Sequence, residues 1–272
     1  MSPVARPARR SEQSRPSGVP PAGTRGGVAA AATAPSPWPS SAPARGPASR
    51  HAEAEAHLRR VDPRLGTVVD RVGPCALRPT IGPRSRPDAP FAALARAIVF
   101  QQLSGRAAET IFGRVLALWR AEEMPSAEVV LATPEARLRG AGLSAAKAAA
   151  IRDLAARSTE GLVPGSRELL RLPDEEILAR LTTVRGVGPW TVQMLLIFHL
   201  GRPDVLPSTD LGVLAGFARV RRLREKPTPR ELERWAERWR PWRTVASWYL
   251  WRALDLERGE GRAQPRGARA TR

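Results

Sequence analysis

Apolar residues recur with a helical period along most of the chain after residue 50. The spacing i, i+3, i+4, i+7 is clearest in 91–98 and in 111–119, and Met124-Pro125 ends the second run. Another run starts after Ser144, which is placed to cap a helix. No segment alternates apolar and polar residues as a strand does, and glycine and proline separate the runs. The pattern predicts an all-α domain of about ten short helices.

The composition changes sharply at two points. Residues 1–50 hold ten prolines and seven arginines against the single acid Glu12, which predicts a disordered basic Pro/Ala/Arg-rich arm. An organellar transit peptide is the alternative, although no amphipathic repeat is present. We expect the helical domain to cover 51–258 and a flexible basic tail to cover 259–272. No apolar run reaches the ~18 residues needed to cross a bilayer, so we expect a cytoplasmic protein with no membrane partner.

Charge and cysteine content narrow the function classes. Lys and Arg number 44 against 26 Asp and Glu, a formal net charge of +18. Such an excess favours an anionic polymer as partner, nucleic acid first and a membrane surface second. The single cysteine, Cys75, excludes a disulfide scaffold and any four-cysteine metal or iron–sulfur site, and the three histidines lack metal-ligand spacing. We expect no metal site.

A tight turn joins two predicted helices in the middle of the chain. The first begins at Pro173-Asp174 and ends at Arg185-Gly186-Val187-Gly188, and the second begins at Pro189, where a missing N–H costs nothing. Two glycines let the backbone turn and direct N–H groups outward at a helix N-terminus, where phosphate binds well. This pattern is typical of a helix-hairpin-helix, and an ordinary turn between packed helices is the alternative.

The residues that follow the turn make the pattern more specific. The stretch Leu181–Val213, which includes Pro207-Ser208-Thr209-Asp210, resembles the helix-hairpin-helix, Gly/Pro-rich, aspartate (GPD) superfamily of DNA base-excision glycosylases. Within that superfamily the chain is most similar to 3-methyladenine DNA glycosylase II. Segments 101–104, 142–147 and 238–251 extend the match. The resemblance implies two helical lobes with a cleft between them for DNA and the damaged base. The family's best-known bacterial member also has an N-terminal β-rich domain, which we do not expect here because the helical pattern starts near His51.

The resemblance places the catalytic carboxylate at Asp210. A carboxylate near C1′ can stabilise the oxocarbenium-like sugar that forms when an N-glycosidic bond breaks, and can orient or deprotonate the attacking water. Asp210 is also well placed simply to cap a helix. Asp204, the other nearby acid, lies in what reads as a turn.

Other site residues are carried over from the same resemblance. Trp190 and Trp251 align with aromatic residues of the base pocket, where indole rings favour a cationic alkylpurine. Phe100 is assigned to the pocket although many relatives have glycine there. Gln102 or Leu103 is expected to fill the gap that a flipped base leaves. The residues expected to bind the DNA backbone are Arg185, Gly186, Val187, Gly188 and Thr191; His199 is given no role.

These assignments predict a glycosylase that hydrolytically excises alkylated purines of the 3-methyladenine and 7-methylguanine type from duplex DNA. Relatives that also cut the strand carry a lysine where this chain has Trp190, so we expect no lyase step. No cofactor is expected, apart from a monovalent cation that the hairpin could hold as in relatives, and a monomer is the default. The alternatives are a non-catalytic DNA-binding module and a glycosylase for oxidised or mismatched bases.

Overall fold

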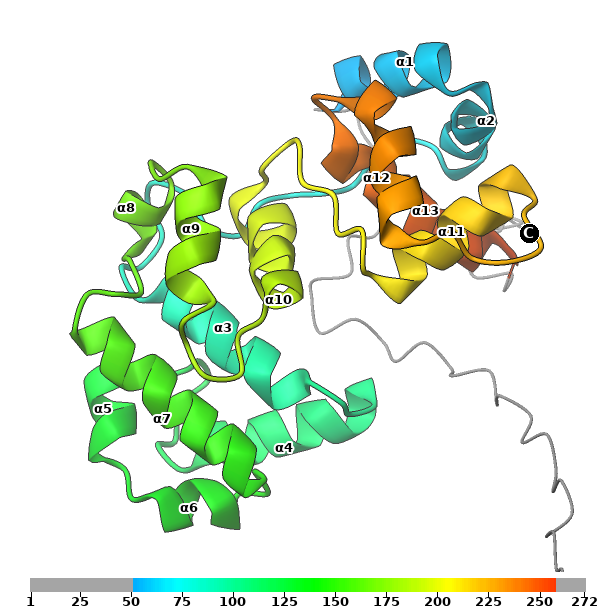
Figure 1. The fold of residues 1–272 in the computed structure, drawn as a ribbon. Helices are drawn as coiled ribbons and strands as arrows, with labels where there is room; N and C mark the ends of the chain where they lie inside the picture. Colours follow the sequence, from blue (N-terminus) through cyan, green and yellow to red (C-terminus); the bar gives the residue numbers. More distant parts are fainter. Residues whose placement is uncertain (1–50, 258–272) are drawn as a thin grey trace, which may run out of the picture. The chain divides into compact units, whose positions relative to one another are not determined.

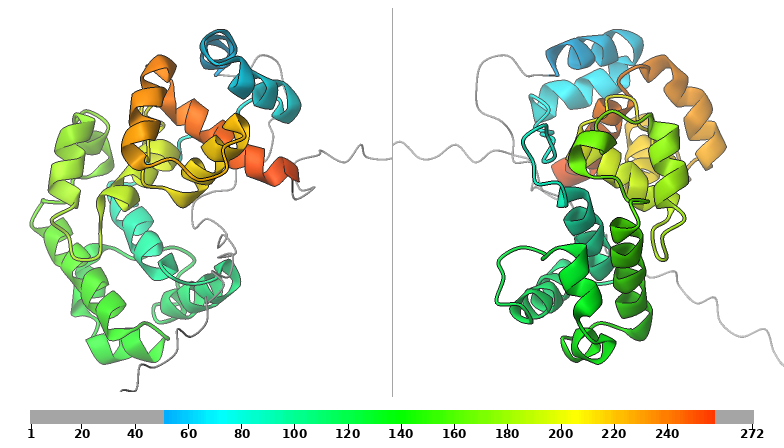
Figure 2. Two further views of the ribbon diagram at one scale, coloured as in Figure 1. Left: turned by 45° about the vertical axis from the view of Figure 1, so that its right-hand side comes forward. Right: turned by 90° about the vertical axis from the view of Figure 1, so that its left-hand side faces the viewer.

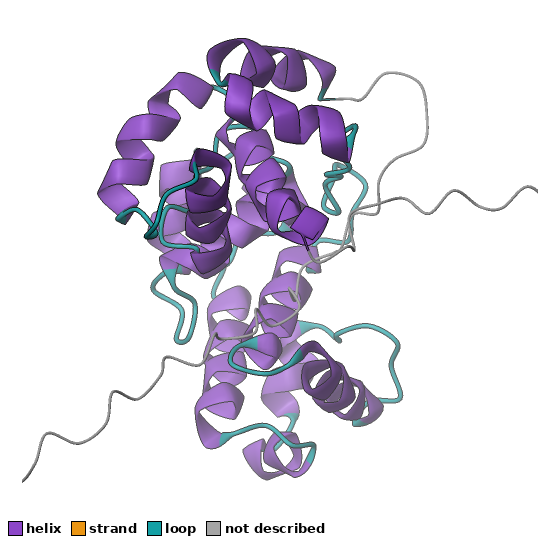
Figure 3. Ribbon diagram, turned by 90° about the vertical axis from the view of Figure 1, so that its right-hand side faces the viewer, coloured by secondary structure: helices purple, strands orange, loops and turns teal. Residues whose placement is uncertain are grey.

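The computed structural model describes residues 51–257, so the expected arm and tail lie outside the described residues. Over the described range the chain forms thirteen α-helices, one π-helical segment and one 3-10 turn, with no strand (Figure 3). The all-α prediction is confirmed. The elements are α1 (Ala52–Val61), α2 (Pro63–Val72), α3 (Ala89–Phe100), α4 (Gly105–Ala117), α5 (Ala127–Ala132), α6 (Glu135–Gly140), α7 (Ala145–Thr159), α8 (Ser166–Leu169), α9 (Asp174–Leu181), α10 (Pro189–Met194), η1 (Leu195–Leu200), α11 (Leu211–Arg221), α12 (Pro229–Ala236), η2 (Glu237–Trp239) and α13 (Arg243–Glu257).

Local start signals predicted the helix N-termini well. Ser144 caps α7, because its side chain accepts a hydrogen bond from the Lys147 N–H at 3.3 Å. The helices α9 and α10 begin at Asp174 and Pro189 as expected. Helix ends differ more: α4 stops at Ala117, short of the predicted break. Within the described residues no helix is both long and apolar enough to cross a membrane.

The helices form two groups by their contacts (Figures 1 and 2). One group combines α1 and α2 with α11, α12, η2 and α13, so it joins the two ends of the described chain. The other group is built from the intervening helices. In it α3, α5 and α6 contact α7, and α9 and η1 contact α10. Each group has fully buried side chains, Trp239 and Tyr249 in the first and Ile151 and Ile177 in the second. The cleft that the resemblance implies stays a prediction.

Asp62 joins three elements of the first group. Its carboxylate caps α2 by accepting the Leu65 N–H at 3.1 Å, and it also accepts the Trp239 indole N–H at 3.0 Å. Arg221, at the end of α11, forms an ion pair with the same carboxylate. A buried carboxylate is stable in a fold when hydrogen bonds and an opposite charge replace its water. Asp62 therefore fixes α2, α11 and η2 to one another.

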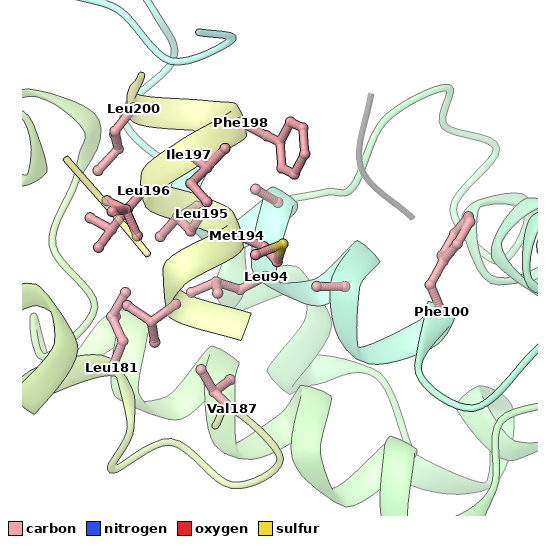
Figure 4. Close-up of a cluster of buried hydrophobic side chains, with 14 of the residues drawn as sticks. Leu94, Phe100, Leu181, Val187, Met194, Leu195, Leu196, Ile197, Phe198 and Leu200 are labelled. Carbon is pink, nitrogen blue, oxygen red and sulfur yellow. The ribbon is translucent and has the colours of Figure 1, made fainter. Parts of the chain in front are cut away.

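The helix that starts at Pro189 does not run on as predicted. From Leu195 to Leu200 it widens into a π-helix, which ends at Gly201 in the left-handed conformation (φ +66°). π-helical turns recur at functional sites. In Figure 4, Leu196 and Leu200 point to one side of this segment and Phe198 to the other. Phe198 thereby reaches Trp251 of α13, with ring centroids 5.6 Å apart and planes inclined by 25°.

Candidate active site

Three N–H groups hold the Asp210 carboxylate. One oxygen, Oδ1, accepts the Val213 backbone N–H and the Trp251 indole N–H, each at 2.8 Å. The other, Oδ2, accepts the Trp190 indole N–H at 2.8 Å. As a residue, Asp210 is half-buried. The structure confirms that Asp210 caps α11, and the catalytic interpretation stays a prediction.

The two tryptophans predicted for the base pocket meet at this aspartate. Trp190 is the second residue of α10 and Trp251 lies in α13, and both present the indole edge to Asp210. One face of Trp251 is already covered by Phe198. A base could therefore stack only on the opposite face of Trp251. The structure brings these residues together as the sequence predicts, and their part in binding a base stays a prediction.

Phe100 lies elsewhere in the fold. It is 6% exposed, and its ring packs edge-on against Phe112 of α4 at 6.1 Å, with the Arg96 guanidinium 3.9 Å from its centroid. Figure 4 shows Phe100 at the end of α3, well apart from Phe198. Its contacts are those of a packing residue between α3 and α4. None of these contacts reaches Asp210, Trp190 or Trp251, and the part of Phe100 in a base pocket stays a prediction.

Asp204 has a different set of partners from Asp210. Its carboxylate accepts hydrogen bonds from Arg243 at 2.7 and 3.0 Å and from Arg240 at 2.7 Å. Two guanidinium groups on one carboxylate make an ion-pair network that joins the 202–206 loop to the start of α13. Asp204 is a structural residue, which leaves Asp210 as the candidate catalyst.

The hairpin between α9 and α10 turns at Gly186, whose φ of +76° only glycine adopts readily. Two of its N–H groups are already bonded, Arg185 N–H to Asp153 Oδ2 at 2.8 Å and Val187 N–H to the Val184 carbonyl at 3.0 Å. The N–H groups of Gly186 and Gly188 have no partner within residues 51–257. These two are the candidates for a phosphate oxygen. Thr191 is 3% exposed, so its predicted contact with DNA cannot use the side chain.

Gln102 and Leu103, the two residues predicted to fill the gap left by a flipped base, lie in the loop after α3 and differ in exposure. Gln102 is exposed and adopts the left-handed conformation (φ +57°), whereas Leu103 packs partly on the core. Gln101 reaches across to the hairpin and donates from Nε2 to the Gly186 carbonyl at 2.8 Å. The geometry thus favours Gln102 as the side chain offered to DNA.

Sequence reasoning missed two residues of the site. Phe198 stacks on Trp251. Gly212 leaves room for the Trp251 ring, because a Cβ on Gly212 would lie 2.8 Å from Trp251 Cδ1 and 3.1 Å from Asp210 Oδ1. Glycine inside a helix costs about 1 kcal/mol relative to alanine, so its presence there signals a close approach. The sequence shows this glycine within a predicted helix, but it does not show that Gly212 meets Trp251, thirty-nine positions later.

The site offers no metal cluster and no lysine at the hairpin. Within the described part of the chain, no three His, Cys, Asp or Glu side chains gather as metal ligands would. Lys147 donates from Nζ to the carbonyls of Val99 and Gln101, at 2.7 and 2.6 Å. Its ammonium is committed to the backbone there, and the position of a lyase lysine is taken by Trp190.

These features define a helix-hairpin-helix DNA-binding fold with a carboxylate held beside it. Residues 95–241 match the family described as HhH-GPD superfamily base excision DNA repair protein. The chain is 36% identical over 204 residues to DNA-3-methyladenine glycosylase 1 of Schizosaccharomyces pombe, covering 75% of this chain and 88% of that protein. The chain belongs to the HhH-GPD superfamily of base excision DNA repair proteins.

Solved structures agree with this placement. The chain is similar to the Schizosaccharomyces pombe 3-methyladenine DNA glycosylase in complex with abasic DNA, with a TM-score of 0.65 and 37% identity over 74% of this chain and 95% of that one. It is also similar to the DNA-3-methyladenine glycosidase of Bacillus halodurans, with a TM-score of 0.68 and 30% identity over 78% of this chain and 94% of that one. The likeness covers nearly the whole of the two solved proteins and about three quarters of this chain.

Proposed function

We propose that this protein is a DNA glycosylase that excises alkylated purines, of the 3-methyladenine and 7-methylguanine type, from duplex DNA and leaves an abasic site. The observation that carries the proposal is the Asp210 carboxylate, held through both oxygens by Trp190, Trp251 and the Val213 N–H. The names of the relatives, which match over nearly their full length, indicate the same substrate class.

Hydrolysis of the N-glycosidic bond of an alkylated purine can be catalysed by one oriented carboxylate. Alkylation makes the purine cationic, so the C1′–N bond breaks with its electron pair going to the base, which leaves as a neutral molecule. The sugar becomes an oxocarbenium-like cation that Asp210 stabilises, and water adds at C1′ and gives up a proton to the Asp210 carboxylate. Because three N–H groups fix the carboxylate in advance, little reorganisation accompanies the step.

The tryptophans supply selectivity in this proposal. The indole faces of Trp190 and Trp251 favour a cationic base over a neutral one by ~0.5–2 kcal/mol per contact. Their N–H edges meanwhile hold Asp210, so recognition and catalysis share the same rings. A flipped base would thus be selected by its charge where it meets the catalytic group.

The enzyme is monofunctional in this proposal, because Lys147 bonds two backbone carbonyls and Trp190 takes the place of a lyase lysine. A lyase would form a Schiff base with the sugar and cut the strand by β-elimination. We expect abasic product in an intact strand, and borohydride trapping of enzyme to DNA should therefore fail.

DNA is bound in this proposal through the N–H groups of Gly186 and Gly188 and the exposed side chain of Arg185, with Gln102 filling the gap in the duplex. Each neutralised phosphate should add about 0.9 to the slope of log affinity against log salt concentration. We further expect a monomer in the bacterial cytoplasm, associated with the nucleoid through DNA. No cofactor is needed, and a monovalent cation on the hairpin carbonyls remains an expectation.

The test uses methylated duplex DNA, with chromatography of the released bases and parallel binding measurements. Asp210→Asn removes the charge and keeps one oxygen that can cap α11 and accept from Trp251, while its NH2 group replaces the oxygen that accepts the Trp190 N–H. Asp70→Asn, at an exposed position in α2, is the matched control. We expect wild type and Asp70→Asn to release 3-methyladenine or 7-methylguanine, and Asp210→Asn to be slower by about 100-fold or more with binding retained.

Two outcomes would contradict the proposal. Undiminished release by Asp210→Asn would show that another group performs the chemistry. Binding without any released base from the wild type would favour a non-catalytic DNA-binding module, and release from oxidised or mismatched DNA alone would change the substrate class.

A further inference from the structure

One side of α7 touches both loops that are expected to meet DNA. At its start, Lys147 donates to the carbonyls of Val99 and Gln101 at 2.7 and 2.6 Å, and so holds the end of α3. α7 packs along α3 in the same group of helices (Figure 1). Lys147 therefore anchors the loop that carries Gln102.

The hairpin meets the same helix further along. Gly186 approaches α7 so closely that a Cβ there would lie 3.1 Å from the Cβ of Ala150. One turn later, Asp153 Oδ2 accepts the Arg185 N–H at 2.8 Å. The three contact residues on α7 are spaced by three, so they follow one side of the helix over about 9 Å. α7 thus fixes the hairpin at a set distance from the loop after α3.

Gln101 joins the two loops directly. Its Nε2 donates to the Gly186 carbonyl at 2.8 Å, while its own carbonyl accepts from Lys147. Each of the two loops is thereby bonded to α7 and to the other loop. Neither loop can shift relative to the other without breaking a hydrogen bond.

The hydrogen bonds of Lys147 and Gln101 hold the backbone next to Gln102. Gln102 has a φ of +57°, a conformation that residues other than glycine adopt at a cost. Such a conformation persists where the surrounding structure enforces it. Here the carbonyls of Gln101, directly before Gln102, and of Val99, three positions before it, are held by one ammonium group. Without that anchor, Gln102 could relax and its exposed side chain would turn elsewhere.

We propose that Lys147 is a positioning residue for base flipping: together with Gln101 it sets the span between the side chain that fills the duplex and the hairpin that grips the phosphate backbone. The inference rests on the proposed function. It assigns Lys147 no contact with the substrate. Its loss should impair the opening of the duplex and spare the cleavage of a base that is already unpaired.

The test compares two substrates under single-turnover conditions. One carries 7-methylguanine opposite cytosine, and the other carries it opposite an abasic analogue, where no pairing must be broken. Lys147→Met removes the ammonium and keeps an unbranched apolar side chain one atom shorter, and Lys226→Met is the control at the only other lysine of the sequence, which is exposed. For Lys147→Met we expect about a tenfold or greater loss on the paired substrate, as for one hydrogen bond to a charged group, and little loss on the unpaired one.

Further variants keep the result interpretable. Gln101→Leu breaks the bond to Gly186 without altering Lys147 and should show the same substrate dependence, even if Lys147→Met folds poorly. Lys147→Arg retains a donor that can reach carbonyls and should recover part of the loss. Equal losses on both substrates, or wild-type rates for both Lys147→Met and Gln101→Leu, would overturn the inference.

A second measurement separates this inference from the proposed function. Duplex DNA with 2-aminopurine beside an abasic analogue reports unstacking by fluorescence and needs no bond cleavage. If wild type releases no base from any substrate, the proposed function fails. The positioning role still stands if wild type raises the fluorescence and Lys147→Met does not, and it fails if the two proteins raise it equally.

Discussion

A single methyl group at Gly212 should disable the site while leaving the fold in place. In Gly212→Ala the new Cβ would lie 2.8 Å from Trp251 Cδ1, 3.0 Å from Trp251 Nε1 and 3.1 Å from Asp210 Oδ1. Trp251 cannot easily swing away, because its ring is stacked on Phe198. The indole N–H must therefore move off the carboxylate, or α11 must shift with Asp210 on it.

The expected magnitudes follow from opposing terms. Crowding a well-packed site costs about 1–3 kcal/mol, and replacing glycine by alanine inside a helix returns about 1 kcal/mol. The free energy of unfolding should thus fall by roughly 0–2 kcal/mol. Losing one hydrogen bond to a charged acceptor costs about 1.5–3 kcal/mol, which corresponds to roughly 10- to 150-fold in the excision rate if the bond acts in the transition state.

The assay is the single-turnover rate of base release, with urea unfolding to follow stability. Gly113→Ala is the matched control, because Gly113 lies within α4 and a Cβ there would meet nothing within 4 Å. That variant should keep the wild-type rate and gain about 0.5–1 kcal/mol of stability. Trp251→Phe removes the donor itself, so combining it with Gly212→Ala should add little further loss. Wild-type rates for Gly212→Ala and Trp251→Phe would refute the role given to this hydrogen bond.

Three further predictions concern stability. Burial, aided by the Arg96 charge, lowers the pKa of His199 from 6.5 to about 4, so the unfolded chain binds the extra proton between these values. Stability should therefore fall by roughly 3 kcal/mol as the pH drops through that window, and urea unfolding of His199→Gln should show a shallower fall. Asp204→Asn should lower the melting temperature and leave the rate of base release per folded molecule unchanged, since its partners are structural. Thr228→Ala removes the capping box of α12 and should cost about 1 kcal/mol in urea unfolding.

Local signals in the sequence predicted the parts of this structure that depend on neighbouring residues. Ser144, Asp174 and Pro189 mark helix starts because caps and first turns use chemistry within a few positions. A local pattern of the same kind predicts that Asp210 caps the helix after it, and Asp210 does cap α11. Its catalytic assignment came from the resemblance, which the family match supports.

Contacts between distant segments could not be predicted from local pattern. The Phe198–Trp251 stack joins η1 to α13, and no periodicity in the sequence records such a contact. The packing of Phe100 against Phe112 could not be predicted for a related reason, because alignment with relatives says where a residue falls in a motif and not which neighbour its ring meets. The anchoring role of Lys147 likewise depends on carbonyls more than forty positions away.

Asp210 links folding and chemistry in one group. The oxygen that caps α11 also accepts the Trp251 N–H, and the other oxygen accepts the Trp190 N–H. Folding therefore completes the orientation of the carboxylate before any DNA arrives, which is what electrostatic stabilisation of a developing cation requires. The positive end of the α11 dipole lies beside the same group and stabilises its negative charge. An alanine at this position would remove the helix cap together with the proposed catalytic group, whereas asparagine keeps an oxygen that can cap α11.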